Sequence, residues 1–176
     1  MYDAVDDPYT YENCTVLVNK FELREQAELD AFEAEVSSAR ANEPLPEGNL
    51  DFAHYKAIHN HLFQDVYEWA GRIRTVRMFK AGNPFCFPEN IDNQATKLFG
   101  DLQADDFLQG RDGSAFANKA AHFLAELNAI HAFREGNSRS QLTFLALLAD
   151  YAGHPIDLDK LDPLEMLDAM IASFDG

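Results

Sequence analysis

The sequence has few basic residues and no long apolar run. Its 176 residues include 14 Lys and Arg against 30 Asp and Glu, so the net charge is −16. A charge of this sign repels polyanions, so we expect no nucleic-acid partner and no anionic-membrane partner, although a local pocket for a phosphorylated small molecule is compatible with it. No apolar run approaches the roughly 18 residues of a membrane-spanning helix.

Cysteine is also scarce, and no targeting pattern is visible. Cys14 and Cys86 lie far apart and match no metal-binding spacing, which indicates free thiols in a reducing compartment. The first residues, M-Y-D-A-V-D-D, are acidic and lack the basic-then-apolar order of a secretory signal. These features predict a cytoplasmic protein.

Hydrophobic residues are abundant enough for a sizeable core. They make up 47% of the chain and include 14 Phe, which predicts one folded domain over residues 1–176. We expect an irregular N-terminal arm over about 1–20. Apolar residues at helical spacing predict an all-α core with helices over about 22–41, 51–69, 88–105, 115–131, 138–151 and 163–174. Two β-prone runs around Gly82-Asn83 predict one hairpin, over about 76–87.

The stretch I-H-A-F-R-E-G-N-S-R-S-Q-L, residues 130–142, joins two of these helices. Gly136, Asn137 and Ser138 stand where the second helix begins, so their backbone N–H groups and the helix dipole favour an anion. Arg139 lies in the first turn of that helix and can reach a phosphate with its planar fork. The sequence therefore predicts a phosphate-binding loop.

Two further side chains of the stretch suit chemistry on that phosphate. Glu135 offers an oxygen ligand for Mg²⁺ beside the anion site. His131 can accept a proton near neutral pH. Phe133 is expected to point inward and to hold the loop. The set suggests activation of a hydroxyl that attacks a nucleotide phosphate.

Each residue alone also has a purely structural interpretation. A histidine that ends a helix is often a cap or a core residue, Glu-Gly-Asn is often only a turn, and an arginine often pairs with a surface acid. The acidic face of helix 22–41 is interpreted as solvated, and binding of a partner is the alternative. His54, His59 and His61 have spacings of five and seven, which do not converge on one ion as i and i+4 would.

The ordered segment H-A-F-R-E-G-N-S-R resembles the signature of Fic-domain proteins: His, any, Phe, any, Asp or Glu, Gly, Asn, a small residue, Arg. Two other stretches resemble the same family. I-H-N-H-L-F-Q-D-V-Y-E-W-A-G-R-I-R-T-V is similar to the segment before its hairpin, and F-K-A-G-N-P-F-C-F-P is similar to its target-positioning flap. The resemblance covers about 50–155.

The resemblance implies a Fic-type helical domain with a β-hairpin flap beside the active-site loop. It implies transfer of AMP from ATP to a hydroxyl of a target protein, with His131 as base and Glu135 holding Mg²⁺. Gly136, Asn137 and Ser138 would cradle the phosphates, and Arg139 would bind the distal ones. The flap would hold the target by strand addition through Met78, Phe79, Lys80, Ala81, Gly82, Asn83 and Phe85.

Two positions depart from the family pattern. Ser138 replaces a common glycine, which is a small change and differs from the Ala-Asn-Lys of the kinase-like branch. Leu142 replaces a second arginine that many members use for the γ-phosphate, so the nucleotide donor is open. Transfer of another group, such as UMP or phosphocholine, is one alternative, and a non-catalytic binding module is another.

The inhibitory pattern of many Fic proteins, Ser/Thr-x-x-x-Glu-Gly/Asn, is absent from this sequence. The resemblance then implies a separate small antitoxin that carries it. A toxin–antitoxin pair or a secreted effector would fit this arrangement. A subunit of a type II topoisomerase is a candidate target by resemblance.

Overall fold

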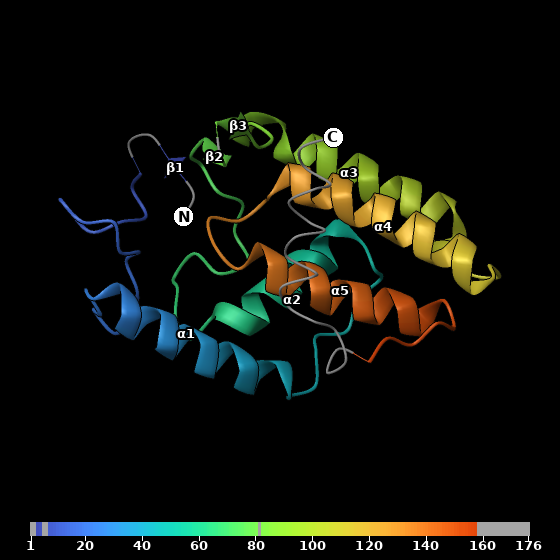
Figure 1. Ribbon diagram of the computed structural model, residues 1–176, viewed down its shortest axis with the longest axis horizontal. Coiled ribbons are helices and arrows are strands. Elements are labelled where there is room, and N and C mark those ends of the chain that lie inside the picture. The colour runs from blue at the N-terminus through green and yellow to red at the C-terminus, as the bar shows by residue number, and fades with distance from the viewer. Residues whose placement is uncertain (1–2, 5–6, 81, 158–176) are drawn as a thin grey trace.

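Five α-helices carry most of the residues that the computed structural model describes, which are 3–4, 7–80 and 82–157 (Figure 1). They are α1 Gln26–Ala41, α2 Phe52–Phe63, α3 Pro88–Ala104, α4 Gly113–Ile130 and α5 Asn137–Tyr151, with a short 3-10 turn, η1, at Asp106–Leu108. The predicted all-α architecture is confirmed. The helix expected over 163–174 lies outside the described residues.

Two helix bounds differ from the prediction. The helix expected over 51–69 ends at Phe63, and the following residues form turns in which the N–H groups of Val66 and Tyr67 both donate to the Phe63 carbonyl at 3.0 Å. Val66 and Tyr67 are buried, so the apolar spacing indicated which residues are buried but did not indicate where the helix ends. Helix α1 begins at Gln26 instead of about 22. The Asn19 side chain accepts from the N–H groups of Phe21 and Leu23 and holds these residues in a turn ahead of the helix.

Local caps set other helix ends. Asp51 accepts from the N–H of His54 at 2.7 Å and caps α2, as its position in the sequence predicted. Asp112 caps α4 in the same way, accepting from Ala115 at 2.8 Å. Pro88 opens α3, where a missing N–H costs nothing.

Helices α2 and α5 pack side by side at the centre, with α1 against α2 and with α3 and α4 on the other side (Figure 1). Aromatic rings fill the space between these helices. Tyr55 of α2 lies 5.3 Å from Phe133 and 5.8 Å from Phe144 between ring centroids, and Phe99 of α3 lies 5.2 Å from Phe144. The loop before α5 is thus anchored in the main core.

A small antiparallel sheet in the order β1-β2-β3 lies beside the helices (Figure 1). Strands β2, Met78–Lys80, and β3, Asn83–Pro84, form the predicted hairpin, with Phe79 opposite Pro84. Strand β1, Asp3–Ala4, was not predicted, because two residues are too few for a recognisable pattern. It brings the N-terminal arm onto the hairpin.

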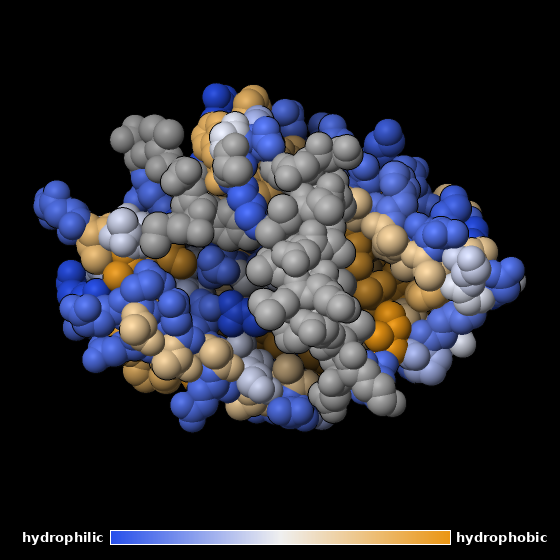
Figure 2. All heavy atoms as spheres, viewed as in Figure 1, coloured by the Kyte–Doolittle hydropathy of each residue, from blue (hydrophilic) through white to orange (hydrophobic). Residues whose placement is uncertain are grey.

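The described residues on the face shown in Figure 2 are mainly polar. Hydrophilic residues cover much of the visible face in Figure 2, in keeping with the charge of −16. Within the described part of the chain, no helix combines the length and the apolar character that crossing a membrane requires.

The aromatic centre predicts the cost of one truncation. Phe144→Ala should lower the free energy of unfolding by about 3–5 kcal/mol, because Phe144 is fully buried and contacts several rings. Tyr151→Ala on the same helix is the control, since that ring is 53% exposed. Urea unfolding followed by circular dichroism measures both, and equal losses would contradict this account of the core.

Candidate active site

The predicted loop reverses the chain between α4 and α5. His131 ends α4 with φ 47° and ψ 63°, and Gly136 precedes α5 with φ 79°. A Cβ added to Gly136 would lie 2.4 Å from a ring carbon of Phe63. Glycine is therefore required here both by the backbone conformation and by the close approach of α2.

Two buried side chains fix the shape of the loop. Phe133 points inward, as predicted, and stacks on His59 with ring centroids 3.7 Å apart. The Asn137 amide accepts from the Phe133 N–H at 3.0 Å and donates to the Phe133 carbonyl at 2.8 Å. The side chain of Asn137 thus holds the loop in shape. Only the backbone N–H of Asn137 is then available to bind an anion.

His131 lies under the hairpin. Its ring is 1% exposed and stacks on Phe85 with centroids 3.9 Å apart. Burial, with a smaller effect from the Arg74 charge, lowers the pKa of His131 to about 3. The imidazole is therefore neutral near pH 7, the form that accepts a proton.

The flap residues do not all face solvent. Gly82 and Asn83 are exposed, and Phe79 and Lys80 are half-buried. Met78 and Phe85 are instead buried in a small cluster with Val76, so only their backbones are open to a strand added at the flap, whose role toward a target stays a prediction. Ala81 lies outside the described residues.

Arg74, which the sequence did not single out, joins the loop to the hairpin. Its buried guanidinium donates to the carbonyls of His131 at 2.7 Å, Val76 at 2.6 Å, Cys86 at 2.6 Å and Ile130 at 3.3 Å. Burial lowers the pKa of Arg74 to about 10, so it stays charged near neutral pH. Arg74 thus binds carbonyls at the C-terminal end of α4 and on both sides of the hairpin.

His59 supports the loop from α2. Its Nδ1 accepts from the Gly71 N–H at 2.8 Å, so Nε2 carries the proton and donates to the Glu135 carbonyl at 2.9 Å. Burial lowers the pKa of His59 to about 3. His54 and His61 bond other carbonyls, and the described residues contain no group of three potential metal ligands.

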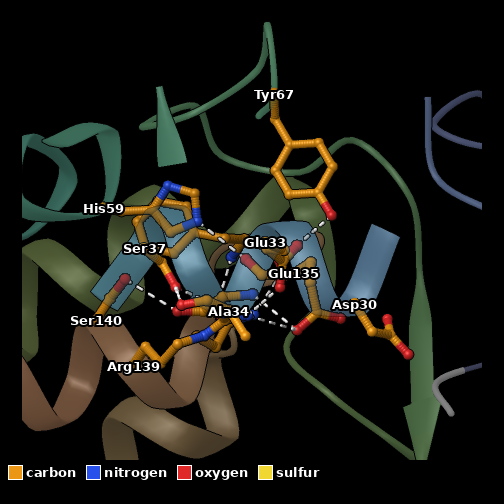
Figure 3. A network of polar contacts seen from close by, with 12 residues as sticks. Asp30, Glu33, Ala34, Ser37, His59, Tyr67, Glu135, Arg139 and Ser140 are labelled. Atoms are coloured by element: carbon orange, nitrogen blue, oxygen red, sulfur yellow. Dashed lines mark hydrogen bonds and ion pairs between the residues drawn. The ribbon is translucent and has the colours of Figure 1, made fainter. Parts of the chain in front are cut away.

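Arg139 is held by α1 (Figure 3). Its Nη1 donates to Ser37 Oγ at 3.0 Å, and its Nη2 forms an ion pair with Glu33. The other oxygen of Glu33 accepts from the Tyr67 hydroxyl. Glu33 is 7% exposed, so one acidic residue of this helix does not belong to the solvated face that the sequence predicted.

Glu135 lies next to this arginine and at the start of α5. Its Oε1 accepts from the Gly136 N–H at 2.9 Å and lies 4.0 Å from Arg139 Nη2. Burial, and more weakly the Glu33 charge, raises the pKa of Glu135. A divalent cation would offset this effect, and one carboxylate beside a phosphate site suits Mg²⁺, which takes its other ligands from phosphates and water. The residues present fit the ion.

The fold and the loop together define a class. A helical core, a β-hairpin over a histidine, and a Glu-Gly-Asn turn that opens a helix with arginine in its first turn form a Fic-type domain. The comparisons with known proteins agree. The Fic/DOC family model matches residues 49–149, and the chain belongs to this family.

Relatives and solved structures extend the match beyond the family model. The chain is 53% identical over 176 residues to the probable protein adenylyltransferase y4lH of Sinorhizobium fredii, covering 99% of this chain and 92% of that protein. The structure is similar to BepC of Bartonella tribocorum with bound AMPPNP, at TM-score 0.83 and 27% identity, covering 94% and 88% of the two chains. It is also similar to a Bep effector Fic domain of Bartonella quintana with bound ADP, at TM-score 0.84 and 30% identity, covering 94% and 86%.

The carbonyls around Arg74 predict a large effect of its removal. Arg74→Met should lower the free energy of unfolding by roughly 3 kcal/mol or more, because buried carbonyls lose their donor. The control is Arg77→Met, whose ion pair with Glu89 is exposed on both sides and should contribute little to stability. Chemical denaturation of both variants measures the free energy of unfolding. A similar small decrease in both variants would refute the role of Arg74.

The pKa of His131 predicts a dependence of stability on pH. Unfolded histidine binds a proton below about pH 6.5, whereas the buried ring stays neutral to about 3, so stability falls as the pH drops through this window. Between about pH 7 and about pH 5, the wild type should lose about 2 kcal/mol more unfolding free energy than His131→Ala.

The exposed His122 on α4 provides the control for this measurement. His122→Ala should keep the pH dependence of the wild type in denaturant titrations. A His131→Ala profile parallel to that of the wild type would show that His131 is protonated in the folded protein.

Proposed function

We propose that this protein transfers AMP from ATP to a hydroxyl side chain of a target protein. The observation that carries the proposal is the complete loop between α4 and α5, which contains His131 at its start and Glu135 and Arg139 at the N-terminus of α5. The 53% identity to a probable protein adenylyltransferase over nearly the whole chain supports it, as do similar Fic structures with bound AMPPNP and ADP.

The proposed reaction assigns a task to each residue. The target hydroxyl oxygen attacks the α-phosphorus of ATP, His131 takes the hydroxyl proton, and pyrophosphate leaves with the electrons of the broken P–O bond. The N–H groups at Gly136, Asn137 and Ser138 bind phosphate oxygens, and Arg139 binds the distal phosphates. Glu135 would hold Mg²⁺, which neutralises phosphate charge when bound.

Phe85 places a condition on this reaction. Its ring covers His131, which is 1% exposed. A hydroxyl can reach the imidazole only after Phe85 moves, so we propose that target binding at the hairpin shifts this ring. A separate antitoxin and a topoisomerase subunit as target complete the proposal, and both are inferred from the family resemblance. The proposed location is cytoplasmic, from the composition of the sequence, or secreted, from the resemblance.

Labelled nucleotides test the proposed transfer. Incubated with Mg²⁺ and a bacterial lysate, the protein should move label from α-labelled ATP, but not from γ-labelled ATP, onto a protein band. His131→Ala should reduce the transfer by about 100-fold or more, the usual contribution of a general base. His122→Ala, which changes an exposed histidine on α4, should leave it unchanged.

Other outcomes would point to other functions. Label from γ-labelled ATP would indicate kinase chemistry. Label from α-labelled UTP alone would indicate another nucleotide donor, a choice that Leu142 leaves open. ATP binding without any transfer would indicate a binding module.

A further inference from the structure

Helix α1 lies outside residues 49–149, the part that matches the family model, yet it contacts the candidate site. It supplies Glu33 and Ser37, two polar partners of Arg139. We propose that Glu33 is a positioning residue that orients Arg139 for the distal phosphates of the nucleotide. This inference rests on the proposed function and adds a helix to the nucleotide site.

Burial separates Glu33 from the other acids of α1. Glu28, Asp30 and Glu35 are exposed, whereas Glu33 is 7% exposed. A buried carboxylate is costly unless its charge and lone pairs are satisfied. Both oxygens of Glu33 are engaged, one by Arg139 and the other by the Tyr67 hydroxyl (Figure 3). These two contacts therefore fix the orientation of the Glu33 carboxylate.

The contacts of Arg139 constrain the guanidinium on several sides. Nη1 donates to Ser37, Nη2 pairs with Glu33, and the group lies over the Phe63 ring at 4.6 Å from its centroid. A free arginine side chain has many rotamers, and ordering them would reduce binding affinity. The contacts with Ser37, Glu33 and Phe63 together favour one orientation of the Arg139 guanidinium.

The guanidinium is nevertheless placed where a phosphate can meet it. The Arg139 side chain is 38% exposed, and its Nη2 lies 4.0 Å from Glu135, the candidate Mg²⁺ ligand at the start of α5. A phosphate chain that begins at the α5 N-terminus and extends past Glu135 would reach this exposed edge. The positioning matters for the β- and γ-phosphates and not for the nucleoside.

Calorimetric titration of Glu33→Gln with ATP, ADP and AMP, each with Mg²⁺, tests the inference. ATP and ADP should bind about tenfold more weakly than to the wild type, the effect of losing one charge-assisted contact, and AMP should bind equally well. The matched control is Glu35→Gln, which removes the same charge from an exposed position of α1. Its affinities should equal those of the wild type.

Three results would overturn the inference. Unchanged ATP affinity would show that Arg139 needs no support, tighter binding would show that Glu33 competes with the phosphates, and an equal loss for all three nucleotides would show a general structural role. In an Arg139→Ala background, Glu33→Gln should have no further effect on ATP binding. A wild type that binds no ATP would instead refute the proposed function itself.

Ser37→Ala provides a second variant that leaves the buried charge in place. It removes the 3.0 Å contact to Arg139 Nη1 and should weaken ATP and ADP binding in the same direction, by less than Glu33→Gln. This variant decides the question if Glu33→Gln does not fold. Wild-type affinity for ATP in Ser37→Ala would then count against the inference.

Discussion

The buried guanidinium of Arg74 is the interaction on which the site depends. Helix α4 ends at Ile130 and leaves carbonyls that no later turn of helix satisfies. Arg74 donates to the carbonyls of Ile130 and His131, where the negative end of the helix dipole also favours a cation. The same group donates to Val76 and Cys86 on either side of the hairpin. The position of His131 and that of the hairpin above it are therefore coupled.

The loop separates two helix ends of opposite polarity. The C-terminal end of α4 has its cation, Arg74, buried within the domain. At the N-terminal end of α5, the first N–H groups of the helix follow Gly136, where the backbone turns into the helix with φ 79°. Glu135 and Arg139 lie next to this end. One reversal of the chain thus provides a satisfied negative end and a positive end that can receive an anion.

The features with local signals were predictable from the sequence. Asp51 as a helix cap, the Gly82-Asn83 turn and the ordered residues from His131 to Arg139 each depend on neighbours a few positions apart. Glu33 and Arg74 were not predictable, because their partners lie far along the chain. Glu33 meets Arg139 106 positions later, and Arg74 meets His131 57 positions later. The spacing of four places Glu33 on the face of Leu29 and Ser37, but it does not tell which distant residue that face will meet.

The strand order β1-β2-β3 limits how the hairpin can accept another chain. Strand β2 has a neighbour on each side, because Asp3 and Ala4 pair with Phe79 and Met78 and because β3 pairs with the opposite edge. Its backbone is thus closed to an incoming strand. A target segment that joins the sheet must align with β3 or with the outer side of β1. The N-terminal arm therefore decides which edges of this sheet remain open to an added strand.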